Sequence, residues 1–276
     1  VAPLILPHLR DRPLSLKRYP NGIQAKFFFQ KDIPATYVSW LRRERIVAEE
    51  NHRPVNFALA DDRASLLYLV QMGCIDHNPW MSRVGHLEEP DFILIDLDPQ
   101  ECPFERVIEA ACLIREKLDE LQLTGYPKTT GGDGLHIYVP IGPGYSYDHT
   151  RIFADILSRI VAQERPDLFT VPRSLAKREK GKVYFDYLQN GMGKTIAAPY
   201  VLRAYPGAPV ATPLAWDEVR PGLTPGQFHL RNALDRFAQL GDLFQPVLHG
   251  KQNLESSLHK LEELLRRPAK PKAARS

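Results

Sequence analysis

Apolar positions recur along the chain with two different periods, and these separate the predicted helices from the predicted strands. Apolar residues three and four apart predict helices over residues 62–72, capped by Asp61 or Asp62, and over residues 104–121, 148–163, 230–240 and 254–265. Alternating or short apolar runs bounded by turn residues predict strands over residues 14–19, 92–97, 126–130, 135–139 and 183–188. Residues 74–80, which follow Gly73, are predicted to form a loop.

The strand over residues 92–97 ends in two carboxylates. Side chains alternate along a strand, so Asp96 and Asp98 share one face, about 6.6 Å apart at Cα. Two anions at the end of an apolar strand repel each other and are costly to desolvate, so they require a cation. Oxygen ligands alone suit Mg²⁺ or Mn²⁺. An isolated Asp-x-Asp fits two loop aspartates at a fraying strand end equally well, and the rest of the chain must decide.

A glycine-rich loop joins the two strands of a predicted hairpin. Residues 126–130 and 135–139 flank Gly131-Gly132-Asp133-Gly134, and His136 points away from the apolar face of the returning strand. A single strand histidine is more often structural than catalytic. Here, however, it follows a loop whose hydroxyls and free amides are suited to hold a triphosphate.

A third candidate metal-binding carboxylate lies on another predicted strand. Asp186 lies on the more polar face of the strand over residues 183–188. Nucleotidyl transfer by two metal ions needs two or three carboxylates, because one ion activates the attacking 3′-hydroxyl and the other neutralises the leaving pyrophosphate. Cationic side chains balance the remaining triphosphate charge.

Composition narrows the class of protein. Of 276 residues, 43% are hydrophobic and 25% are charged, which is ordinary for a soluble globular protein, and neither a membrane-spanning run nor a signal peptide is apparent. The three cysteines lack Cys-x-x-Cys spacing, which argues against structural zinc and a disulfide framework and fits the cytoplasm. A net charge of +3 does not by itself indicate nucleic acid, but residues 42–45, 177–182 and the tail from Arg266 form basic clusters.

Predictions can also be made for three further segments. Phe27, Phe28 and Phe29 lie between lysines; at least one is expected in the core, whereas an exposed one would be a platform for stacking on a base. The chain opens in apolar sequence without a methionine, so a start inside a longer polypeptide is expected. Residues 266–276 are rich in Pro, Ala and Lys and are expected to form a flexible tail or linker.

The sequence strongly resembles the polymerase domain of bacterial DNA ligase D, a member of the archaeo-eukaryotic primase superfamily. The resemblance covers nearly the whole chain to about residue 265, and its motifs occur in the family's order. The matching stretches are residues 9–14, 17–22, 28–31, 91–99, 130–136, 186–190 and 206–210.

The resemblance implies an α/β (α+β) fold: a primase-polymerase core with an RRM-like mixed sheet flanked by helices, plus an additional N-terminal β-rich part. It implies a single domain over residues 1–265 that lacks the family's basic N-terminal segment, which grips a recessed 5′-phosphate. It implies a nucleotidyltransferase that adds nucleotides, preferably ribonucleotides, to DNA ends during non-homologous end joining. The implied cofactors are two Mn²⁺ or Mg²⁺ ions. The implied partners are primer–template DNA ends, NTP or dNTP, Ku and an ATP-dependent ligase domain in cis or in trans, in the bacterial cytoplasm at the nucleoid and away from membranes.

The resemblance also assigns roles by position. Asp96, Asp98 and Asp186 match the metal-binding triad. The nucleotide-binding positions are Lys17, Phe28, Phe29, Asn78, Thr130, Gly131, His136 and Arg203. Asn78 stands where many relatives have a histidine near the sugar, Gln189 and Tyr205 where some have arginine, and Asp133 where some have lysine. These departures lower the local positive charge.

Two other functions remain as alternatives. A stand-alone primase-polymerase of replication or excision repair would carry the same site. A non-catalytic DNA-end binding module is disfavoured, because a binder of polyanions gains nothing from clustered negative charge.

Overall fold

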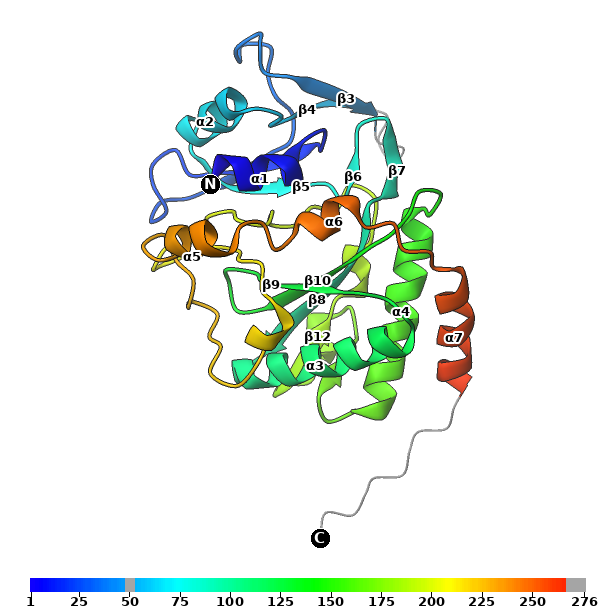
Figure 1. Ribbon diagram of the computed structural model, residues 1–276. Helices are drawn as coiled ribbons and strands as arrows, with labels where there is room; N and C mark the ends of the chain where they lie inside the picture. The colour runs from blue at the N-terminus through cyan, green and yellow to red at the C-terminus, as the bar shows by residue number, and fades with distance from the viewer. Residues whose placement is uncertain (48–52, 267–276) are drawn as a thin grey trace.

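The computed structural model describes residues 1–47 and 53–266 (Figure 1). Its helices are α1 (Ala2–Leu9), α2 (Arg63–Gln71), α3 (Phe104–Glu120), α4 (Tyr147–Glu164), α5 (Ala233–Leu240), α6 (Gln245–His249) and α7 (Glu255–Arg266). Its strands are β1 (Leu14–Arg18), β2 (Phe28–Gln30), β3 (Arg43–Val47), β4 (Pro54–Ala58), β5 (Cys74–Pro79), β6 (Ser82–Arg83), β7 (His86–Pro90), β8 (Phe92–Gln100), β9 (Tyr126–Thr129), β10 (Leu135–Pro140), β11 (Phe169–Thr170) and β12 (Lys182–Phe185). The predicted α/β (α+β) class is confirmed.

The central sheet has the strand order β11-β12-β8-β10-β9, and β8 pairs antiparallel with both β12 and β10. Only β11 and β12 run parallel, so the sheet is mixed, as predicted. Helices α3 and α4 lie together on one side of it, and α7 packs beside α4 (Figure 1). The polar side chains of β8 project from its other side, toward the end of the strand.

Alternation along β8 explains this two-sided arrangement. Ile93, Ile95 and Leu97 are buried in the main apolar core together with the inward faces of α3 and α4. Each such fully buried side chain contributes about 1.5–3 kcal/mol relative to an exposed one. The opposite face begins with buried Phe92 and Leu94 and then becomes acidic, so the carboxylates stand at the end of an anchored strand.

A second sheet precedes the central one along the chain. It has the order β2-β1-β4-β3, with β5 also paired to β1. Helices α1 and α2 pack against it (Figure 1). Asp62 caps α2, as predicted, because its carboxylate accepts a hydrogen bond of 2.7 Å from the backbone N–H of Ser65. This sheet is the predicted N-terminal β-rich part.

Several elements differ from prediction. The predicted loop over residues 74–80 is strand β5, whose polar residues pair with β1. The predicted strand over residues 183–188 ends at Phe185, and Asp186 caps a short 3₁₀-helix. The patterns did not predict α1, α6, β2, β3, β4, β6, β7 or β11. Residues 267–276 of the expected tail lie outside the described residues.

Where β12 ends, an amide side chain continues the pairing along β8. The buried Asn190 accepts a hydrogen bond of 2.8 Å from the Leu94 N–H and donates one of 2.7 Å to the Leu94 carbonyl. The side chain therefore satisfies both backbone groups of Leu94, as a neighbouring strand would.

None of the helices in the described ranges is both long and apolar enough to span a bilayer.

Candidate active site

Strand pairing brings the three aspartates to one place. In the β8–β12 register Tyr184 lies opposite Asp98 and Phe185 opposite Leu97. One step further, the backbone N–H of Asp186 donates a hydrogen bond of 2.9 Å to the carbonyl of Asp96. Residues opposite each other on paired strands project to the same face. Asp186 is therefore on the same side of the sheet as Asp96 and Asp98.

This cluster carries more negative charge than its surroundings balance. Burial, followed by the charge of Asp186, raises the pKa of Asp96 to about 7. Burial, followed by the charge of Asp96, raises the pKa of Asp98 to about 8. Oδ1 of Asp96 is buried without a hydrogen bond to any residue that the structure describes, although Nε2 of His136 lies 3.3 Å away. A bound cation would relieve both costs.

The donors fit a hard divalent ion, because all three are carboxylates. Within residues 1–47 and 53–266, however, no group of three or more His, Cys, Asp or Glu side chains is already arranged to hold a metal ion. The fit thus rests on the kind of donor, their shared face and their raised pKa values, and not on a closed coordination shell.

The raised pKa of Asp98 predicts an unusual dependence of stability on pH. Since its protonated form is favoured in the folded protein, the carboxyl costs stability progressively as pH rises from about 4 through about 8. Without divalent ions, Asp98→Asn should raise Tm at pH 8 by about 2–4 °C, for a gain of about 1 kcal/mol. The gain should shrink when the melting curves are repeated at pH 5.

Asp167→Asn is the matched control for this measurement. Hydrogen bonding to Arg165 lowers the pKa of Asp167 to about 2, so its carboxylate favours the folded state at pH 8. The control should therefore not raise Tm. An Asp98→Asn gain that is equal at pH 5 and pH 8 would contradict the assigned pKa.

The glycine-rich loop packs directly against the carboxylates. β9 and β10 form the predicted hairpin, but the amides of Gly132 and Gly134 are not free, because both donate to the Thr130 hydroxyl, at 3.0 and 3.2 Å. A Cβ on Gly134 would lie 2.5 Å from the Leu97 carbonyl oxygen and 2.9 Å from Oδ1 of Asp98. Only glycine permits this approach of the loop to β8.

Two of the predicted cationic residues share a buried carboxylate that the sequence did not point to. Asp76 lies on β5, with Nε of Arg203 2.6 Å from Oδ1 and Nζ of Lys17 3.8 Å from Oδ2. Neither contact meets hydrogen-bond geometry, so both are ion pairs. Arg203 also donates to the carbonyl of Thr130. It thereby joins the second sheet to the glycine loop, and at Gly131, where φ is +70°, a Cβ would lie 2.6 Å from Cγ of Arg203.

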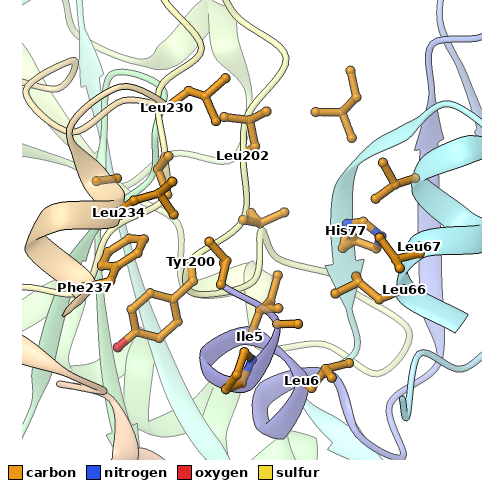
Figure 2. Close-up of a pocket in the computed structure, with 18 of the residues that line it drawn as sticks. Ile5, Leu6, Leu66, Leu67, His77, Tyr200, Leu202, Leu230, Leu234 and Phe237 are labelled. Atoms are coloured by element: carbon orange, nitrogen blue, oxygen red, sulfur yellow. The ribbon is translucent and has the colours of Figure 1, made fainter. Parts of the chain in front are cut away.

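Asn78 and His77 face opposite sides of β5. Asn78 is on the side of Asp76, because the two are separated by two positions. His77 is on the other side, where it lines a cavity of about 660 Å³ together with apolar residues of α1, α2 and α5 (Figure 2). Burial lowers the pKa of His77 to about 4. His77 therefore does not stand in for Asn78 beside the carboxylates.

The phenylalanine cluster is more exposed than predicted. Phe27, Phe28 and Phe29 are 42%, 44% and 61% exposed, so the expectation that at least one belongs to the core is wrong. Lys17 lies opposite Phe29 on the neighbouring strand and 4.3 Å from the ring centroid of Phe27. Phe28 instead lies opposite Arg18. The aromatic pair beside Lys17 is thus Phe27 with Phe29.

One of the basic clusters borders the carboxylates. Arg178, from the cluster over residues 177–182, lies over the ring of Tyr184 at 3.3 Å from its centroid. Together with Arg173 and Lys194 it lines a cavity of about 410 Å³ that reaches Asp186. Positive charge therefore continues outward from the acidic cluster.

A buried lysine was also missed, because lysine is ordinarily a surface residue. Lys128, on β9, is opposite His136 on β10, which in turn is opposite Asp96 on β8. His136 thus points away from the apolar core, as predicted, and lies between a cation and a carboxylate. Alternation along residues 126–129 could have indicated the position of Lys128, but not its burial.

Known proteins resemble this chain along most of its length. A family model described as "LigD, primase-polymerase domain" matches residues 1–244. The chain is 32% identical over 268 residues to the "Bifunctional non-homologous end joining protein LigD" of Bacillus subtilis, covering 95% of this chain and 42% of that protein. It is 34% identical over 240 residues to the "Multifunctional non-homologous end joining protein LigD" of Pseudomonas aeruginosa, covering 87% and 28%. The chain thus spans less than half the length of these relatives.

A solved structure has the same fold. The polymerase domain of Mycobacterium tuberculosis ligase D in complex with DNA superposes with a TM-score of 0.83 at 29% identity, covering 91% of this chain and 90% of that one.

Proposed function

This chain belongs to the LigD primase-polymerase domain family, and on that premise we propose that it is a metal-dependent nucleotidyltransferase that extends 3′-hydroxyls at DNA ends. The observation that carries the proposal is the convergence of Asp96, Asp98 and Asp186 on one face of the central sheet. The reaction class follows from the donors, because clustered carboxylates with raised pKa values bind divalent ions and not phosphates directly.

Asp96, Asp98 and Asp186 are the residues that would hold two Mn²⁺ or Mg²⁺ ions. When bound, such ions activate a 3′-hydroxyl and neutralise the leaving pyrophosphate. Arg203 and Lys17 are held close by through Asp76, where their charges would orient a triphosphate. The closeness of Gly131 and Gly134 to Arg203 and Asp98 keeps the glycine loop beside both.

The base of the incoming nucleotide would stack on the exposed aromatic cluster. Phe29 and Phe27 stand on the Lys17 side of β1 and β2, so a nucleotide with its base there has its phosphates near Lys17 and Arg203. Asn78 shares the Asp76 side of β5 and is the proposed contact to the sugar. Since an asparagine offers both a donor and an acceptor, it suits a ribose hydroxyl.

DNA is the proposed macromolecular substrate. The similar mycobacterial domain is a complex with DNA, and Arg173, Arg178 and Lys194 offer cations beside Asp186 for a phosphate backbone. The relatives' names place them in non-homologous end joining. We therefore propose the same pathway here, with Ku and an ATP-dependent ligase domain as partners, in the bacterial cytoplasm at the nucleoid.

Primer extension tests the proposal. The purified chain should add labelled ATP or GTP to a primer–template with a recessed 3′ end when Mn²⁺ or Mg²⁺ is present, and EDTA should stop the addition. Unprimed single-stranded template is the matched control and should give no product. Dinucleotide synthesis on that template would support the stand-alone primase instead, while inactivity with every ion and substrate would refute the proposal.

A further inference from the structure

Lys128 is fully buried at the end of a row of polar side chains. Its Nζ lies 3.0 Å from Nδ1 of His136 and 3.4 Å from the carbonyl of Thr129. On the far side of the ring, Nε2 of His136 lies 3.3 Å from Oδ1 of Asp96. The row crosses three neighbouring strands, so backbone pairing fixes its order.

This burial is costly, and among residues 1–47 and 53–266 no carboxylate is in contact with Lys128. Desolvation, and then the charge of Arg203, lowers the pKa of Lys128 well below its ordinary value. An apolar side chain of similar length would fill the same space without that cost. A buried lysine whose close side-chain partner is a histidine beside an acidic cluster therefore calls for a function.

The contacts on the two ring nitrogens of His136 select one tautomer. A lysine amine can donate to Nδ1 whether or not it is charged, whereas an ammonium cannot accept. If Nδ1 carried the proton, the ammonium of Lys128 would have no acceptor on the ring, and the lone pair of Nε2 would face Oδ1 of Asp96, which is also an acceptor when that carboxyl is ionised. A proton on Nε2 instead leaves Nδ1 free to accept from Lys128 and places a hydrogen on the side of Asp96, whose Oδ1 lies 3.3 Å from Nε2 but outside hydrogen-bond geometry.

We propose that Lys128 is a positioning residue, which holds His136 in the tautomer with hydrogen on Nε2 and directs that hydrogen toward the carboxylates and the incoming triphosphate. The tautomer is inferred from the contacts of the two ring nitrogens and does not depend on the proposed reaction. The benefit to triphosphate binding rests on the proposed nucleotidyl transfer.

The tautomer can be measured on the unmodified protein. In a sample with ¹⁵N-labelled histidine, His136 should show a protonated Nε2 and an unprotonated Nδ1, with its signals assigned by their loss in His136→Gln. A protonated Nδ1 would overturn the proposal. Because this spectrum needs neither nucleotide nor DNA, an inactive protein would refute the proposed function and leave the result on Lys128 standing.

Substitution separates positioning from packing. Lys128→Met keeps the length of the side chain and removes the donor, so it should raise KM for ATP about tenfold while kcat changes less than about threefold. The His136 spectrum should then show a mixture of tautomers. Lys128→Gln retains a donor and should recover part of the loss.

Lys117→Met is the matched control. Lys117 is also buried, but it is paired with Glu120 and Glu164 on the helical side of the sheet. Its loss should change Tm and leave KM and the His136 spectrum unchanged. A folded Lys128→Met protein with wild-type KM and tautomer would overturn the positioning role, and if that variant does not fold, the wild-type spectrum still decides.

Discussion

Replacing Asp96 and Asp98 together by alanine should reduce primer extension by at least about a thousandfold, with Tm in EDTA at pH 8 equal to or above that of the wild type. Both carboxylates are proposed metal ligands, and burial together with repulsion from neighbouring carboxylates raises the pKa of each, so they favour activity at the expense of stability. Initial rates of labelled-ATP addition, measured with saturating Mn²⁺, give the comparison.

Affinity for DNA distinguishes loss of chemistry from loss of structure. The double variant removes negative charge close to where phosphates would pass, so binding to the same primer–template without metal should be equal or tighter. Asp119→Ala with Asp148→Ala removes two exposed carboxylates from α3 and α4 and should leave extension intact. Normal extension by the Asp96→Ala, Asp98→Ala protein would exclude these residues from catalysis.

Replacing Gly134 by alanine should lower activity by about a hundredfold, because a displacement of about 1 Å at a reacting centre has an effect of that size. The new Cβ would lie 2.5 Å from the Leu97 carbonyl, a backbone atom that cannot move aside without shifting β8. It would also press on Oδ1 of Asp98, 2.9 Å away. We expect a loss of about 1–3 kcal/mol in the free energy of unfolding from this overpacking.

Gly132→Ala is the control within the same loop. Its Cβ would have no neighbour closer than 3.4 Å, an ordinary contact with Oγ1 of Thr130. Its activity and Tm should both stay near the wild-type values. Similar losses in the two variants would mean that the loop tolerates no side chain for reasons other than its contact with β8.

Periodicity predicted the elements that the apolar core builds. The stripe of α3 and the apolar run of β8 pack against each other, so their patterns report directly on the buried faces. β5 was missed because its buried positions include Asp76 and His77, and a buried carboxylate that is paired with cations from other segments leaves no apolar signal. β3 was read as a basic cluster because it is a charged strand at the edge of its sheet.

The acidic residues of the site could be named from the sequence, but their arrangement could not. That Asp186 meets Asp96 depends on the register of β12 against β8, which no local pattern determines. In the same way, the register of β2 against β1 places Phe28 opposite Arg18 and Phe29 opposite Lys17, although the two phenylalanines are adjacent in the sequence. The role of Asp76 depends on Lys17 and Arg203, which are distant in the sequence, and the role of Lys128 depends on His136 of the neighbouring strand.

The side chain of Asn190 has a consequence for how the site moves. Asp186 is tied to β8 on both sides, by its own N–H to the Asp96 carbonyl and, four residues later, by the two amide bonds of Asn190 to Leu94. Thermal motion of the segment after β12 must therefore carry the third carboxylate along with the strand that holds the other two. Their spacing should therefore persist when that segment moves.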